Sequence, residues 1–143
     1  MGAAKSCTGC CLCGATGMEI ARASTQVHAC HCTMCRKWGG AAMLAVACGT
    51  DITLNGEQDI TIYNSSAWAE RGFCGTCGTH LFYRLKDSGQ YFVPIGLLDI
   101  NDQQLVFEHE IFIDEKPSYY EFGNETEALT GAEFLAHYVA KSS

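Results

Sequence analysis

The chain has 143 residues, of which 48% are hydrophobic and 17% charged, and its formal net charge is −7. This is the size of one ordinary domain, and the apolar fraction is high enough to bury a core, which excludes a disordered chain. The acidic excess lies entirely after residue 100, so a basic nucleic-acid-binding face is not expected. The longest apolar run, Ala41–Cys48, is too short to span a membrane, and Met1–Ser6 lacks the apolar core of a secretory signal. We therefore expect a cytoplasmic protein that binds neither nucleic acid nor membranes.

The first elements expected between the cysteine clusters are strands. Residues Ala41–Ala47 form a short apolar run between two glycines, which is typical of a strand buried on both faces, although a helix also fits. Residues Ile52–Leu54 and Ile60–Tyr63 lie on either side of Asn55-Gly56, which predicts a β-hairpin.

The second half of the chain continues this pattern. Residues His80–Leu85 and Tyr91–Ile95 flank Asp87-Ser88-Gly89 and predict a second hairpin. Residues Leu105–Ile113 are a further strand candidate, with Phe107, His109, Ile111 and Ile113 on one face and Glu108 and Glu110 on the other. Only Glu125–Lys141 has helical spacing of its apolar residues. The whole pattern predicts a single domain over residues 1–143, mainly β and antiparallel, with a short C-terminal helix.

Ten cysteines are the most informative residues of the chain, and nine of them fall into tight clusters. Cysteines two or three residues apart are poor partners for structural disulfides, and nothing in the sequence indicates secretion. Clusters at this spacing suit a tetrahedral zinc ion instead. We therefore interpret the clusters as metal ligands; their positions are 7, 10, 11 and 13, then 30, 32 and 35, then 74 and 77.

One zinc site is expected at Cys74-Gly-Thr-Cys77, because a CxxC turn brings two thiolates to a common point. This turn supplies only two ligands, and a four-coordinate zinc site needs two more. The spacing of the N-terminal cysteines leaves three pairs open as the other half of the site: Cys7/Cys10, Cys10/Cys13 and Cys11/Cys13.

A second site is expected at Cys30-His31-Cys32-Thr33-Met34-Cys35, where three sulfurs lie in one short loop. Structural zinc is normally closed by four protein ligands, whereas catalytic zinc keeps three and leaves one position for water or substrate. Seven of the clustered cysteines would then divide into a group of four and a group of three, which predicts one structural and one open zinc site. The alternative is a closed second site, with a fourth ligand supplied by one of Cys48, His28, His31 and His80.

The order of these motifs resembles the glutathione-dependent formaldehyde-activating enzyme family, which also includes centromere protein V. The matching segments are Gly9-x-Cys11-x-Cys13-Gly14, then Cys30-His31-Cys32-x-x-Cys35-Arg36-Lys37-x-x-Gly40, then Arg71-Gly72-Phe73-Cys74-x-x-Cys77-Gly78-Thr79-x-Leu81-Phe82, then Gly96-Leu97-Leu98-Asp99 and His109-Glu110-Ile111-Phe112-Ile113-Asp114. The resemblance covers roughly residues 9–122, and Cys7 and Cys10 lie outside the pattern that carries zinc ligands.

The resemblance implies an Mss4-like fold of twisted antiparallel sheets stabilised by zinc. It further implies two zinc ions. The structural zinc would be held by Cys11, Cys13, Cys74 and Cys77, and the catalytic zinc by Cys30, Cys32 and Cys35. Both assignments agree with the division into four and three that the spacing indicates.

The resemblance also implies a carbon–sulfur lyase. The enzyme for which the family is named joins formaldehyde and glutathione to give S-hydroxymethylglutathione. The expected function is therefore zinc-dependent chemistry on a glutathione adduct or a small aldehyde, with a small-molecule thiol as partner. Arg36 and Arg71 flank the cysteine motifs and are candidates for binding substrate carboxylates.

Two other functions fit the same residues. The chain could be a non-catalytic, zinc-stabilised protein-binding module, in which case the second site would have a fourth protein ligand or no metal. A thiol-redox protein that uses Cys32 and Cys35 is disfavoured, because that CxxC pair lies within a CxC context.

Overall fold

The chain was studied as a computed structural model, in which residues 4–136 are described. It consists of two compact units, each built from two separate stretches of sequence. The first unit contains the residues up to Gln26 together with Ala45–Val106, and the second contains Val27–Leu44 together with the residues from Phe107 on. The expectation that these units act as one domain stays a prediction.

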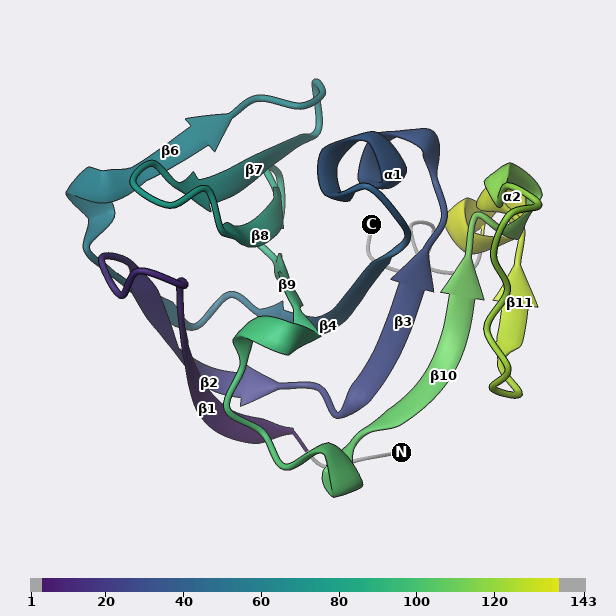
Figure 1. The fold of residues 1–143 in the computed structure, drawn as a ribbon, viewed down its shortest axis with the longest axis horizontal. Helices are drawn as coiled ribbons and strands as arrows, with labels where there is room; N and C mark the ends of the chain where they lie inside the picture. The colour runs from purple at the N-terminus through teal and green to yellow at the C-terminus, as the bar shows by residue number, and fades with distance from the viewer. Residues whose placement is uncertain (1–3, 137–143) are drawn as a thin grey trace. The chain divides into compact units, whose positions relative to one another are not determined.

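One part of the first unit is a three-stranded antiparallel sheet. Its strands are β1 (Lys5–Cys10), β2 (Gly17–Ala23) and β5 (Ile52–Asn55), in the order β1-β2-β5, and β1 and β2 are labelled side by side in Figure 1. Strand β2 is central and supplies the buried side chains Met18, Ile20 and Ala23. Burial of these apolar groups is the main force that holds β1 and β5 against it.

The rest of the first unit is a series of antiparallel strands in the order β4-β9-β8-β7-β6. The bounds are β4 (Met43–Gly49), β6 (Ile60–Tyr63), β7 (Ala69–Cys74), β8 (His80–Leu85) and β9 (Tyr91–Pro94). Val46, Leu81 and Val93 are fully buried on three neighbouring strands of this series. Three short 3₁₀ turns lie between strands: η1 (Glu57–Asp59), η2 (Ile95–Leu97) and η3 (Asp102–Gln104).

The second unit contains the strands β3 (Gln26–Cys30), β10 (Val106–Ile111) and β11 (Glu127–Leu129), in the order β11-β10-β3. Helix α1 (Thr33–Gly39) follows β3 directly (Figure 1). The 3₁₀ turn η4 (Ile113–Glu115) follows β10. Helix α2 (Gly131–Phe134) comes after β11. The pair β10/β11 is parallel, which departs from the antiparallel pattern expected from the sequence.

The predicted fold class, mainly β with a short C-terminal helix, is confirmed, and so is the hairpin of β8 and β9. The first predicted hairpin is wrong. The strands β5 and β6 exist, but β5 pairs with β2 and β6 pairs with β7. The Asn-Gly turn continues into η1, and Gly56 has a left-handed φ of 68° with Ala15 O in the space of a Cβ. The chain therefore leaves β5 without turning back on it.

The predicted helix over Glu125–Lys141 is partly wrong. Residues Glu127–Leu129 form strand β11, and the helix begins only at Gly131. Thr130 caps it with a capping box, in which Glu133 N donates to the Thr130 hydroxyl and Thr130 N donates to the Glu133 carboxylate. This Thr-x-x-Glu signal in the sequence marks where the helix starts. Residues 137–141 of the predicted helix lie outside the described part of the chain.

Candidate metal centres

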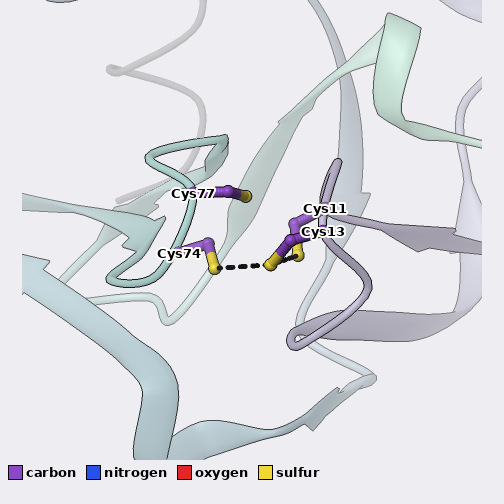
Figure 2. A group of neighbouring side chains, drawn as sticks. All are labelled: Cys11, Cys13, Cys74 and Cys77. Carbon is purple, nitrogen blue, oxygen red and sulfur yellow. Dashed lines mark hydrogen bonds between the residues drawn. The ribbon is translucent and has the colours of Figure 1, made fainter.

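The first unit brings together Cys11, Cys13, Cys74 and Cys77, with all four sulfurs within 4.8 Å of one another. Figure 2 shows these side chains pointing toward one another from two separate loops. Cys11 and Cys13 lie in the turn between β1 and β2, and Cys74 ends β7 just before the turn that carries Cys77. In that second turn Cys74 N donates to Thr79 O and Gly78 N to Cys74 O, so the backbone folds around the sulfurs.

The spacing of these sulfurs fits a tetrahedral metal. The Cys11 and Cys13 sulfurs are 3.6 Å apart, and those of Cys13 and Cys74 are 3.9 Å apart. A disulfide needs about 2.05 Å. A zinc tetrahedron with Zn–S bonds of about 2.3 Å has an edge of about 3.8 Å. The residues therefore fit a zinc ion held by four thiolates, and of the three N-terminal pairs left open by spacing the structure selects Cys11/Cys13 for this group.

Local hydrogen bonds favour the thiolate form of two cysteines in this group. Cys77 Sγ lies 3.2 Å from the Thr79 hydroxyl, which together with the Thr79 backbone lowers the pKa of Cys77 to about 5. Hydrogen bonding by Thr16, whose backbone N lies 3.3 Å from Cys11 Sγ, lowers the pKa of Cys11 to about 7. Since the thiolate is the form that binds metal, these bonds prepare Cys77 and Cys11 for a cation. Cys13 differs: although the Ala15 backbone acts to lower it, burial and hydrogen bonds with the neighbouring cysteine thiols raise the pKa of Cys13 to about 12.

The second unit brings together the sulfurs of Cys30, Cys32 and Cys35, again within 4.8 Å of one another. Cys30 ends β3, Cys32 is the N-cap of α1, and Cys35 lies in the first turn of that helix, with Cys35 N donating to Cys32 Sγ over 3.4 Å. Cys30 and Cys35 are buried, whereas Cys32 is half-buried. Hydrogen bonds from the thiols of its two partners lower the pKa of Cys32 to about 2.

An apolar layer packs against this second group. Ile111 is buried with Cys30 and Cys35 in one cluster, and partly buried side chains surround it: Met43, Phe112, Leu129 and Phe134. Phe112 has a left-handed backbone with φ 56°, and its ring occupies the space next to Gly131 at the start of α2. Such surroundings limit water around the sulfurs and strengthen their electrostatic interaction with a bound cation.

The group has no fourth ligand among residues 4–136, since no further His, Cys, Asp or Glu offers an atom within the same 4.8 Å. Of the four candidates for that role, His31 lies between two of the cysteines but directs Nε2 to Glu110 and Nδ1 to Tyr120. Cys48 is buried at 1% exposure on β4, and burial raises its pKa to about 12. His28 lies on β3 and His80 on β8, and neither belongs to the three-cysteine group.

The two candidate arginines have different surroundings. The Arg36 side chain on α1 is half-buried, and its Nε donates to His31 O over 2.9 Å. Arg71 on β7 is buried at 3% exposure, and its guanidinium carbon lies 4.9 Å from the centre of the Tyr83 ring. The role of each in binding a substrate stays a prediction. Glu110 and Tyr120, which contact His31, were not expected from the sequence, where Glu110 looks like the exposed residue of an alternating strand.

The sequence of this chain matches a known protein family. The family model described as "Glutathione-dependent formaldehyde-activating enzyme" matches residues 6–115, which include both cysteine groups. The chain belongs to this family. The motifs indicated an extent of roughly residues 9–122. The matched range starts a little before residue 9 and ends a little before residue 122.

Three fungal relatives support this membership. A Schizosaccharomyces pombe protein named "Uncharacterized lyase" is 30% identical over 126 residues, which are 87% of this chain and 91% of that protein. Two further proteins are both named "Putative glutathione-dependent formaldehyde-activating enzyme". The one from Podospora anserina is 32% identical over 57% of this chain, and the one from Phaeosphaeria nodorum is 32% identical over 62% of it. The aligned regions are 41% and 52% of those two longer proteins.

Among solved structures, the crystal structure of a Rhodobacter sphaeroides protein is similar to this chain with a TM-score of 0.57 and 25% sequence identity. The similarity covers 67% of this chain and 92% of that protein. The Mss4-like, mainly β fold class implied by the family resemblance therefore stands. Within residues 4–136, none of the helices has the length and apolar character needed to cross a membrane.

Proposed function

We propose that this chain is a zinc-dependent carbon–sulfur lyase of the formaldehyde-activating type, acting on a small aldehyde and a glutathione-like thiol. The observation that carries the proposal is the group of three sulfurs in the second unit, which has no fourth His, Cys, Asp or Glu ligand among the described residues. In a member of this family, such a three-thiolate group suits a metal that keeps one position for a substrate.

Two roles follow for the cysteines. Cys11, Cys13, Cys74 and Cys77 would hold a structural zinc, because four protein thiolates leave no position for a substrate. Cys30, Cys32 and Cys35 would hold the catalytic zinc. When bound there, zinc supplies a positive charge that favours a substrate thiolate or polarises an aldehyde oxygen.

The proposed reaction is a balanced addition. The sulfur of the thiol forms a bond to the aldehyde carbon, the carbonyl π bond breaks, and the thiol proton ends on the new hydroxyl. No oxidant or reductant is needed. In this scheme the half-buried Cys32 marks the side of the group that substrate reaches, and the apolar layer formed around Ile111 limits competing water.

The arginines would bind the carboxylates of the thiol. Arg36 Nε donates to His31 O, and one outer guanidinium nitrogen lies 3.5 Å from the Thr33 hydroxyl. The outer nitrogens are the groups that a substrate carboxylate would meet. The buried guanidinium of Arg71 is proposed for the same role. We further propose that the enzyme works in the cytoplasm, where glutathione-like thiols are reduced.

Titration calorimetry with glutathione and with S-methylglutathione tests this function directly. The thiol should bind the two-metal protein and the S-methyl derivative should bind at least about 10-fold more weakly, because only the former yields a thiolate. Cys32→Ser should remove that difference. Equal affinity for both compounds would overturn thiol capture, and a total absence of binding would favour the non-catalytic protein-binding module instead.

A further inference from the structure

His31 is completely buried, and all four of its polar groups are hydrogen-bonded within the second unit. Its backbone N donates to Ile111 O over 3.0 Å, and its backbone O accepts from Arg36 Nε over 2.9 Å. Its ring nitrogens lie 2.8 Å from Glu110 Oε1 and 2.6 Å from the Tyr120 hydroxyl. A residue bonded in this way can neither rotate its ring nor shift its backbone without breaking several hydrogen bonds.

The anchor of this network is a carboxylate that is itself nearly buried. Glu110 is 8% exposed; one oxygen contacts His31 Nε2, and the other accepts a 2.5 Å hydrogen bond from the Thr126 hydroxyl. A buried carboxylate is costly unless its oxygens are paired. The chain Thr126–Glu110–His31–Tyr120 satisfies both oxygens and both ring nitrogens. With Nε2–H donating to the carboxylate, Nδ1 accepts from the tyrosine hydroxyl.

The residue held by this network is the immediate neighbour of two cysteines of the three-sulfur group. His31 lies between Cys30 and Cys32 in the sequence, so fixing its backbone fixes where both of their side chains begin. The far end of the same loop is also tied down, because Thr33 N and its hydroxyl both donate to Glu115 Oε1, over 3.0 and 2.9 Å. The partners in the segment 110–120 thus hold the loop on both sides of Cys32.

We infer that His31 is a positioning residue, which Glu110 and Tyr120 hold so that the three sulfurs stay close together with or without a metal. Three neighbouring thiolates repel one another and would spread apart in a flexible loop. Because the network orders the loop before a metal binds, the free-energy cost of bringing the three sulfurs to one cation is lower. Hydrogen-bond partners outside the ligands have this effect in metal sites generally. This inference rests on the proposed metal at Cys30, Cys32 and Cys35.

The test uses the full chain loaded with zinc, and follows transfer of the metal to a chromogenic chelator. Tyr120→Phe removes the hydroxyl at His31 Nδ1 and keeps the ring, which packs near Phe122 and Lys116. We expect about 10-fold faster release of the metal of the three-cysteine group. The metal of the four-cysteine group should leave at the wild-type rate. Cys32→Ser identifies which kinetic phase belongs to which group.

Matched variants separate positioning from general stability. Tyr119→Phe changes the neighbouring tyrosine, which is 72% exposed, and should release both metals at the wild-type rates. Thr126→Val, nearly isosteric, should accelerate the same single phase as Tyr120→Phe by a smaller factor, and it carries the test if Tyr120→Phe does not fold. Unchanged release from a folded Tyr120→Phe or Thr126→Val protein would overturn the role of His31. A wild-type chain that holds only one metal would overturn the proposed function itself.

Discussion

At the scale of single residues, the environment of each cysteine decides its chemistry. Cys32 and Cys77 have neighbours that stabilise a thiolate, whereas Cys48 has an apolar environment that stabilises the neutral thiol and raises its pKa. Cys48 is 1% exposed, and its sulfur lies 3.6 Å from Val46 O on the same strand. Cys48 therefore behaves as a small buried hydrophobe near the end of the apolar strand β4.

The buried thiol of Cys48 predicts a pH dependence of stability. Burial raises its pKa from the ordinary 9.0 to about 12, so between these values the folded chain keeps a proton that the unfolded chain has released. The free energy of unfolding should therefore fall as pH rises above about 9. Cys48→Ala should flatten this fall in urea unfolding between about pH 8 and pH 11. Cys10→Ala, at an exposed position, is the control; an identical pH slope in the wild type and Cys48→Ala would contradict the prediction.

At the scale of elements, close packing explains motif residues whose purpose is not visible in the sequence. Gly72 on β7 is directly paired with Phe82 on β8. A Cβ built on Gly72 would lie 2.4 Å from two carbons of the Phe82 ring, which is 3% exposed. The glycine in Arg71-Gly72-Phe73-Cys74 therefore leaves room for an aromatic ring of the neighbouring strand, and it lies two residues before a cysteine of the four-sulfur group.

This packing predicts that Gly72→Ala costs about 1–3 kcal/mol of unfolding free energy, because the Phe82 ring must leave its position. Gly39→Ala is the matched control, since a Cβ on that glycine meets nothing within 4 Å. It should remain within about 1 kcal/mol of the wild type. Urea unfolding of the three metal-loaded proteins measures both changes. Equal stability of Gly72→Ala and Gly39→Ala would show that the ring relaxes freely.

The elements also show how far sequence patterns reach. The apolar run at β4 and the two runs that flank Asp87-Ser88-Gly89 predicted strands correctly, because burial and turn formation are local properties. The pairing of β5 with β2 could not be predicted in this way, since it joins strands that are far apart in the sequence. The burial of Glu110 was hidden for the same reason, because its partners His31 and Thr126 come from distant parts of the chain.

At the scale of the whole molecule, each of the two compact units contains one group of cysteines. Spacing alone predicted the division into four and three sulfurs. Spacing did not identify Cys11/Cys13 as the N-terminal pair. That pairing depends on the turn between β1 and β2 lying next to the turn after β7. The family resemblance supplied that choice, and the distances within the four-sulfur group agree with it.

The proposed roles predict different consequences for the two groups. Cys74→Ser should unfold the chain or leave it insoluble, because metal binding at a structural site contributes directly to folding. Cys32→Ser should lose one metal equivalent and keep a cooperative melting transition. Circular dichroism, thermal melting and elemental analysis measure these outcomes, with Cys10→Ser as a near-neutral control. Native-like melting of Cys74→Ser would contradict the structural role.

X-ray absorption at the zinc edge tests the central claim most directly, because it counts sulfur ligands on the metal. With two zinc ions bound, the mean coordination should be about 3.5 sulfurs per zinc, the mean of four and three. Addition of glutathione should raise it to about 4, and S-methylglutathione should leave it unchanged. A mean of four sulfurs before any thiol is added, or a value that glutathione does not change, would contradict a three-thiolate site that takes up the substrate thiol.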